Sequence, residues 1–519
     1  MSKKEQFIAA IQKSYKTDKP VIHLGSAILD GEILTEARVN LPLRMMNRHG
    51  LVAGATGSGK TRTLQLLAEQ LSAAGVPVFM SDIKGDLSGI AQPGTANAAM
   101  QERSEILGTS FEPKGYPVEL YSLSGQKGAQ MRATILEFGP VLLSKIFELN
   151  ETQSGVLSVL FKYADDKDLP MVDLNDLKKV LNYLAEGPGA AEIKADYGSI
   201  SSSTAGTILR KIVALEQQGV GTIFGEKSFE ITDLIDRVDG QGVISLLNIS
   251  DVQDKPALFS TFMLSLLAEL YQKLPEAGDL DKPKLVFFLD EAHLLFKGAP
   301  KAFMDQIEQV VRLIRSKGVG IFFCTQMAQD IPVSVLSQLG NRVQHVLRSF
   351  TPQDADALKQ TVKTYPKSSF YEIDQMLTTL GIGQALITVL NDKGIPTEVA
   401  ATHLLPPTSV MGPMSQADYE NHVRQSSLYA KYKDPVDPES AYEILTRRME
   451  EHARTEVVSK EERKPAPRRE KEEKSVVSEA LSSPLAKQIG REVVRGVFGM
   501  LFGKSTSRTR KTGGGLFGF

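Results

Sequence analysis

Short apolar runs alternate with longer stretches of helical periodicity from His49 onward, and this alternation is the strongest pattern in the chain. The apolar runs are residues 51–53, 76–80, 118–121, 243–247, 285–289, 321–324 and 343–347. Runs this short, apolar on both faces, are typical of buried strands in a parallel sheet that helices cover on both sides. The pattern therefore predicts an α/β fold around a central, mainly parallel sheet.

Residues 134–218 interrupt the alternation and carry few strand signals. Helical patterns occur there at 135–149, 155–165, 174–184 and 203–217, so we interpret the segment as a helical insertion into the sheet domain. Further helices are expected at 257–273 and 303–317. Two strands, 383–389 and 397–401, are expected to close the core before Pro406 and Pro407.

The composition changes toward both ends of the chain. Residues 1–48 form a short segment with an amphipathic start and strand-like alternation over 21–43, ahead of a core predicted at 49–405. Residues 406–459 are more polar and are predicted to be a helical extension. Residues 460–519 are a charged linker and a basic tail, and the mixed charges and prolines of 460–474 are typical of disorder.

The tail repeats apolar residues every four positions over 485–502, which predicts a basic amphipathic helix. Residues 485–512 hold seven basic residues and one acidic residue. Such a helix can pack against its own assembly, bind a protein partner, bind DNA phosphates or lie on an anionic membrane. The pattern leaves these alternatives open.

Charge and cysteine content narrow the class of protein. The 519 residues include 60 basic and 62 acidic ones, a formal net charge of −2, so no global basicity indicates nucleic acid. The single cysteine, Cys324, excludes an internal disulfide framework and fits a reducing compartment. Because 18 apolar residues never run together and the start resembles no signal peptide, we expect a soluble, cytoplasmic protein without a transmembrane segment.

Residues 54–61 read GATGSGKT and match the phosphate-binding pattern G-x-x-x-x-G-K-[ST] in full. The motif follows a predicted strand and opens a predicted helix, the context that makes a chance match improbable. The glycines let several backbone N–H groups converge on one anion at the helix N-terminus. Lys60 is expected to reach the β- and γ-phosphates, and Thr61 to offer its hydroxyl to Mg²⁺. The predicted nucleotide-binding residues are Gly54, Ala55, Thr56, Gly57, Ser58, Gly59, Lys60 and Thr61.

An apolar strand at 285–289 ends in two acids, Asp290 and Glu291. Ligands bind at the carboxyl ends of strands in open α/β sheets, so Asp290 is expected to hold Mg²⁺ there and Glu291 to activate the attacking water. The second acid favours ATP over GTP and favours true hydrolysis. The alternative to this catalytic role is a purely structural one, in which the two acids cap the following helix.

Three further sets of polar residues are weaker candidates. Gln326 follows the strand 321–324 and Thr325, where an amide can sense the γ-phosphate, although a surface polar pair is the plain alternative. Arg312, Arg315, Arg342 and Arg348 are candidates for an arginine finger, although a solvated or salt-bridged role is the plain alternative for each. Asp82, in the segment SDIKGD, either serves the site, by contacting it through water or by holding Lys84, or simply ends a strand in a turn.

Together, HGLVAGATGSGKT (49–61), SDIKGD (81–86), FFLDEAH (287–293), RSKGVGIFF (315–323) and Thr325–Gln326 resemble the HerA/FtsK superfamily of RecA-like motor ATPases, above all the bacterial HerA-like proteins. The resemblance covers roughly residues 22–405. It implies a RecA-like fold, a homohexameric ring that hydrolyses ATP with Mg²⁺ between subunits, and double-stranded DNA threaded through the pore. It also places Arg315, three residues before Gly318, at the position of the family's finger, which acts on the neighbouring subunit.

The chain departs from the family in two places. Its first 48 residues are too few for a full HerA β-barrel, and the membrane spans and winged helix of FtsK-type motors are not visible. DEAH-box RNA helicases share TGSGKT and DEAH, but Lys60 and Asp290 lie too far apart in the sequence for that class, and the Ser-Ala-Thr motif is missing. His293 is therefore expected to start a helix rather than to couple two motor domains.

The sequence thus predicts an ATP-hydrolysing ring motor that translocates or unwinds double-stranded DNA. Two alternatives stay open. One is an ATP-dependent scaffold or switch that remodels protein partners, and the other is a coupling ATPase that acts on single-stranded DNA. The ATPase prediction rests on the residues themselves, whereas the DNA prediction rests on the resemblance.

Overall fold

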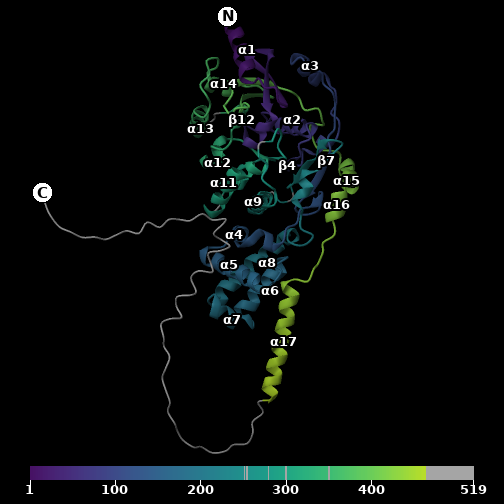
Figure 1. The fold of residues 1–519 in the computed structure, drawn as a ribbon, viewed down its shortest axis with the longest axis vertical. Coiled ribbons are helices and arrows are strands. Elements are labelled where there is room, and N and C mark those ends of the chain that lie inside the picture. Colours follow the sequence, from purple (N-terminus) through teal and green to yellow (C-terminus); the bar gives the residue numbers. More distant parts are fainter. Residues whose placement is uncertain (251, 253–254, 279, 298–300, 349–350, 463–519) are drawn as a thin grey trace, which may run out of the picture. The chain divides into compact units, whose positions relative to one another are not determined.

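A computed structural model describes residues 1–462 except 251, 253–254, 279, 298–300 and 349–350 (Figure 1). Most of the described chain belongs to one unit, Met1–Glu456, and the second unit begins at Val457. The predicted tail helix at 485–502 and residues 463–474 of the predicted linker lie outside the described residues.

Twelve strands of the described chain form one sheet, in the order β2-β1-β14-β13-β12-β3-β11-β10-β4-β9-β5-β6. From β12 to β6 the neighbouring strands run parallel, and β13, β14, β1 and β2 extend the sheet with antiparallel pairs. The strands are β1 (Val21–Leu29), β2 (Glu32–Pro42), β3 (Gly50–Ala53), β4 (Val78–Asp82), β5 (Val118–Ser122), β6 (Ala129–Gln130), β9 (Ile244–Asn248), β10 (Leu285–Leu289), β11 (Val319–Thr325), β12 (Asn341–Gln344), β13 (Gln384–Thr388) and β14 (Ala400–Leu404). A separate pair consists of β7 (Arg237–Val238) and β8 (Gln241–Gly242).

Helices cover the sheet and extend beyond it. They are α1 (Lys3–Ser14), α2 (Lys60–Ala73), α3 (Ala98–Ile106), α4 (Ile135–Ile146), α5 (Glu151–Asp166), α6 (Leu174–Ala185), α7 (Gly189–Asp196), α8 (Ser202–Gln217), α9 (Pro256–Lys273), α10 (His293–Phe296), α11 (Lys301–Ile314), α12 (Val333–Leu336), α13 (Pro352–Val362), α14 (Ile373–Thr379), α15 (Gln416–Gln425), α16 (Ser427–Tyr432) and α17 (Ala441–Glu462).

Successive residues of the central strands enter two different cores. Phe287 of β10 packs in the core that contains α9, α11 and the insertion, and its neighbour Phe288 packs with α1 and α2 on the opposite face. A strand buried on both faces needs an uninterrupted apolar sequence, since alternate side chains point to opposite faces. The predicted seven runs therefore appear as strands, with ends that differ by no more than three residues.

Helices α4 to α8 occupy the segment 134–218 that the sequence marked as an insertion, and they group together in Figure 1. The continuous helix expected at 135–149 is wrong in detail. Gly139 adopts a non-helical backbone (φ 69°, ψ 170°) before Pro140, and the helix ends at Ile146. Proline restricts the residue before it and disfavours the α region there, which explains the break.

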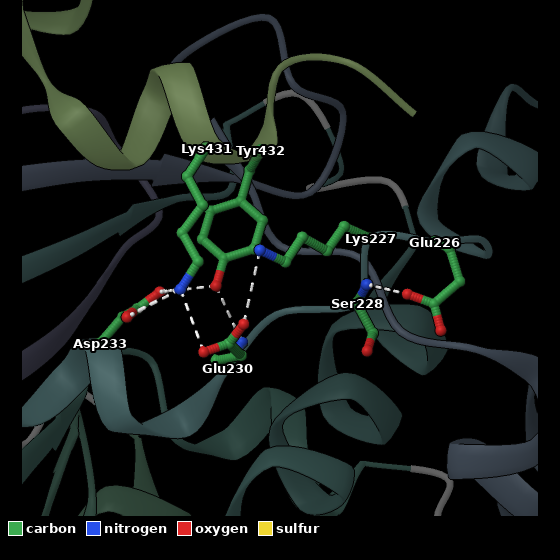
Figure 2. Close-up of polar contacts among 7 residues, drawn as sticks. All are labelled: Glu226, Lys227, Ser228, Glu230, Asp233, Lys431 and Tyr432. Carbon is green, nitrogen blue, oxygen red and sulfur yellow. Dashed lines mark hydrogen bonds and ion pairs between the residues drawn. The ribbon is translucent and has the colours of Figure 1, made fainter. Parts of the chain in front are cut away.

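Within the unit Met1–Glu456, the N-terminal segment and the C-terminal extension both pack against the core. Residues 1–48 add β1 and β2 to the edge of the main sheet, where Gly25 pairs with Leu404 of β14. At the other end, Lys431 and Tyr432 of α16 bind Asp233 at 2.9 and 2.5 Å, and Lys431 also pairs with Glu230 at 3.1 Å (Figure 2). Since Tyr432 is fully buried, this polar cluster fixes the C-terminal extension to the 3-10 helix Ile231–Ile235 that precedes β7.

Candidate active site

The loop Gly54–Thr61 joins the end of β3 to the start of α2, as predicted. Gly54, Gly57 and Gly59 have φ values of +150°, +77° and +111°, which other residues rarely adopt. A Cβ added at Gly54 would lie 2.5 Å from His345 Cβ, so that position also has no room for a side chain. Gly59 caps α2, and the free N–H groups of its first turn therefore face the loop.

Lys60 begins α2 and folds back over the loop. Its Nζ donates to the carbonyl oxygens of Gly54 at 2.7 Å and Ala55 at 3.1 Å. The ammonium is thus held above the turn whose N–H groups would surround a phosphate. Thr61 follows in the first turn of α2 and is half-buried. Backbone donors, a helix N-terminus and a lysine in one concave loop make an anion site.

The two acids follow directly after β10. Asp290 is 7% exposed, and its backbone N–H donates to Ser81 Oγ at 3.0 Å. Its carboxylate accepts the Glu291 N–H at 2.9 Å. Glu291 has a φ of +47°, an uncommon conformation for a residue other than glycine, and its Oε2 is buried. That oxygen lies 3.4 Å from His293 Nδ1 and accepts no hydrogen bond from the part of the chain that the structure describes.

Strand β11 lies between β3 and β10 and brings the predicted sensor to the same edge. In the strand register, Thr325 pairs with Ala53, and Phe323 pairs with Leu289. Thr325 donates from its hydroxyl to Asp330 at 2.6 Å, which fixes the turn that follows, and Gln326 is exposed beside it. The carboxyl ends of three adjacent parallel strands therefore carry the glycine loop, the acidic pair and the amide.

The four candidate arginines do not lie together: they occupy different ends of the strands and a helix. Arg315 lies in the turn before β11, at the amino end of that strand, and is exposed. Since a strand rises about 3.3 Å per residue, the seven residues of β11 span about 20 Å between the end that follows Arg315 and the end beside the glycine loop. Arg348 follows β12 on the glycine-loop edge and is exposed, whereas Arg342 lies within β12 and Arg312 on α11.

His345 was missed in the sequence, although it lies directly under the loop. Its Nδ1 lies 2.9 Å from the carbonyl oxygen of Gln384, and its Nε2 lies 2.9 Å from Thr63 Oγ1. A carbonyl only accepts, so Nδ1 carries the proton and Nε2 accepts from Thr63. Burial, and then the nearby positive charge of Lys60, lower the pKa of His345 to about 4. The signal in the sequence was a pair of polar residues, Gln344 and His345, within a strand run that is otherwise apolar.

Asp82 has a structural role in this geometry. Its carboxylate accepts the backbone N–H groups of Gly85, Asp86 and Leu87 at 2.7, 3.2 and 3.0 Å. Burial raises the pKa of Asp82 to about 6, although these three donors oppose the shift. The structure therefore shows Asp82 in a turn that ends the strand. This is one of the two interpretations that the sequence left open.

The comparisons with known proteins agree with this arrangement. A family model described as Helicase HerA-like C-terminal matches residues 28–508. The chain belongs to this family. The predicted membership of the HerA/FtsK superfamily and the predicted P-loop ATPase class are therefore confirmed.

Two curated relatives are both named DNA double-strand break repair helicase HerA. They come from Sulfolobus acidocaldarius and Sulfurisphaera tokodaii, and each is 22% identical, over 389 and 377 residues. The matches cover 71% and 68% of this chain and 67% and 64% of the relatives, so the chain spans about two thirds of their length.

One solved structure is that of the plasmid coupling protein TrwB in complex with the non-hydrolysable GTP analogue GDPNP. It is 12% identical, with a TM-score of 0.50, and the match covers 78% of this chain and 94% of that one. This likeness confirms the predicted α/β fold. No helix in the described part of the chain has the length and apolar character that a membrane span requires.

Proposed function

We propose that the chain hydrolyses ATP with Mg²⁺ and uses the energy to move along or unwind double-stranded DNA. The observation that carries the proposal is the convergence of Gly54–Thr61, Asp290–Glu291 and Gln326 at the carboxyl ends of β3, β10 and β11. Ligands of open α/β sheets bind at this edge. A glycine loop, two carboxylates and an amide are the groups that phosphoryl transfer to water requires.

Each group has a distinct role in this proposal. The loop N–H groups and Lys60 bind the β- and γ-phosphates. The Thr61 hydroxyl and the Asp290 carboxylate are hard oxygen donors at one edge, the ligands that suit Mg²⁺, and the ion neutralises phosphate charge when bound. No donor among the described residues bonds to the buried oxygen of Glu291, so this oxygen can accept the proton of the attacking water. Gln326 orients that water or contacts the γ-phosphate.

The place of Arg315 supports a ring of identical subunits. This side chain cannot reach the nucleotide of its own subunit, because the full length of β11 separates them. In a head-to-tail ring, however, the amino edge of one sheet can face the carboxyl edge of the next. Arg315 of one subunit would then neutralise charge at the site of its neighbour. The homohexamer that the family resemblance implies satisfies this requirement.

DNA is the proposed substrate because the two archaeal relatives are named as DNA double-strand break repair helicases. The net charge of −2 gives no general attraction to phosphates, so contact with DNA would depend on local surfaces. The cytoplasmic location and a protein partner for the basic tail stay predictions.

The test is steady-state ATP hydrolysis by the wild type, Glu291→Gln and the matched control Glu450→Gln, each with no DNA, duplex or single strands. Glu450 is exposed on α17, away from the site. Glu291→Gln removes the general base and should lower kcat by about 100-fold or more. Glu450→Gln should behave as the wild type.

Stimulation by duplex together with a hexameric mass in solution supports the motor. Stimulation by single strands alone would point to a coupling ATPase. Hydrolysis by a monomer that ignores DNA would refute both the ring and the DNA substrate and leave only the nucleotide site.

A further inference from the structure

The turn after β11 carries Gln326, but nothing in the described part of the chain binds the end of its side chain. Gln326 is exposed, and no described residue forms a hydrogen bond with its amide. A long side chain without a partner samples several rotamers, so the place of its amide depends first on the backbone that carries it. Whatever fixes the backbone at residue 326 therefore belongs to the site.

Asp330 fixes that backbone from both sides. Its Oδ2 accepts a hydrogen bond from Thr325 Oγ1 at 2.6 Å and a second one from the backbone N–H of Met327 at 3.1 Å. The two donors are the immediate neighbours of Gln326 in the sequence. Hydrogen bonds to a carboxylate are stronger than those to a neutral acceptor, and water competes little for the bond of the fully buried Thr325. One oxygen atom thus clamps the turn around the predicted sensor.

Asp330 can act as an anchor because its own segment is held independently of Gln326. It ends the short 3-10 helix Ala328–Asp330, whose first residue is buried, and the next residue, Ile331, is buried as well. Within this helix, Gln329 donates from Nε2 to the Ala357 carbonyl of α13 at 2.7 Å. The carboxylate therefore lies on a segment that packs against the core, and from there it holds the exposed residues 326 and 327.

The backbone of Thr325 does not depend on this clamp. Its carbonyl oxygen accepts the Gly54 N–H at 3.3 Å, and the carbonyl oxygen of Cys324 accepts the Ala292 N–H at 2.8 Å. Strand β11 also pairs with β3 and β10 on its two sides. Loss of the Asp330 carboxylate should therefore release the turn from residue 326 onward and leave the glycine loop in place. Hydrolysis should respond to this loss, and nucleotide binding should not.

We propose that Asp330 is a positioning residue for ATP hydrolysis, which holds the turn so that Gln326 can reach the γ-phosphate or the attacking water. The inference rests on the role proposed above for Gln326. Asp330 itself touches neither the nucleotide nor the water and acts through its neighbours in the turn. A reacting group that is misplaced by about 1 Å can lose about 100-fold in rate, which sets the size of the expected effect.

The experiment is a double-mutant cycle in steady-state ATP hydrolysis, with the wild type, Asp330→Ala, Gln326→Ala and the double variant. Asp330→Ala should lower kcat by about 10–100-fold at an unchanged KM. Gln326→Ala should lower kcat by about 100-fold, as expected for the loss of one group that stabilises the transition state. The double variant should equal Gln326→Ala within about twofold, because the carboxylate then has no sensor to position.

Two controls separate positioning from stability. Both bonds of Asp330 go to the same oxygen, so the amide oxygen of Asp330→Asn can accept both, and kcat should stay within about fivefold of the wild type. Asp173→Ala is the matched control. Asp173 is also half-buried and accepts two backbone N–H groups, those of Asn175 at 2.7 Å and Asp176 at 3.1 Å, at the start of α6. Its loss should leave kcat unchanged. Every variant should bind a non-hydrolysable ATP analogue as tightly as the wild type.

The proposal is overturned if Asp330→Ala lowers kcat equally in the wild-type and Gln326→Ala backgrounds, leaves kcat unchanged, or weakens binding of the analogue. A fully active Gln326→Ala would overturn it as well. If Asp330→Ala does not fold, Thr325→Val removes one donor to the same carboxylate and must show the same dependence on Gln326. A wild type that binds the analogue but never hydrolyses ATP would instead refute the proposed function, and with it the reaction that Asp330 serves.

Discussion

The buried His345 makes the stability of the fold depend on pH in a way that one substitution can isolate. In the folded chain the pKa of His345 is about 4, compared with 6.5 for a free imidazole. Between pH 4 and pH 6.5, His345 is therefore protonated in the unfolded chain and neutral in the folded chain. Stability is fully present above pH 6.5 and falls as the pH drops toward 4. At pH 5 the single histidine should cost about 2 kcal/mol of unfolding free energy relative to pH 7.

The perturbation is His345→Gln, which removes the titration but keeps a polar side chain under the loop. Urea unfolding followed by circular dichroism at pH 7 and pH 5 gives the loss for each protein. The wild type should lose about 2 kcal/mol more than His345→Gln over this range. His49 and His403, whose pKa values burial also lowers to about 4, contribute equally to both proteins and cancel.

The control for this measurement is His452→Gln, because His452 is exposed on α17. It should lose as much stability as the wild type between pH 7 and pH 5. Equal losses in the wild type and His345→Gln would refute the assignment of a neutral histidine beneath the loop.

Two further predictions concern the ring and the core. Arg315→Ala and Lys60→Ala should each lower kcat by about 10³-fold or more. Mixing the two should restore turnover at about a quarter of the interfaces of a head-to-tail ring, and no recovery in steady-state hydrolysis of the mixture would exclude action in trans. Lys145 is 8% exposed, donates to Ser260 and lies 3.3 Å from the centre of the Phe303 ring, and burial lowers its pKa to about 7. Lys145→Met should raise the unfolding free energy at pH 7 by about 1–3 kcal/mol, and a lower urea midpoint would show that the ammonium stabilises the core.

The sequence revealed those parts of the fold whose physical cause is local. The strand at 285–289 is apolar at every position because both of its faces are buried, and the structure has the same ends. His293 begins α10, as expected. Helix α7, in contrast, has no regular apolar repeat over Gly189–Asp196 and was not predicted. Strand β4 extends to Asp82 because pairing with β9 continues past the apolar run.

The residues of the site also fall into two groups, those that a local sequence motif reveals and those that depend on contacts with distant parts of the chain. The spacing of glycines, Lys60 and Thr61 identifies the loop because backbone conformation and charge are encoded within eight neighbouring residues. The contribution of His345 depends on Thr63 and Gln384, which lie 282 and 39 residues away in the chain. No local pattern encodes such a contact.

The pairing of the first strands with a late one has a consequence for biosynthesis. Strand β1 pairs with β14, and Gly25 meets Leu404 across 379 residues of chain. At about 5–20 residues per second, the ribosome needs roughly 20–80 s to deliver that partner. During this interval the hairpin β1–β2 presents an unpaired edge, which is a template for aggregation. The β3 strand likewise waits for β11 and β12, at 319–344, before both of its sides are paired. The phosphate loop of a nascent chain would thus be completed only after more than half of the protein has been synthesised.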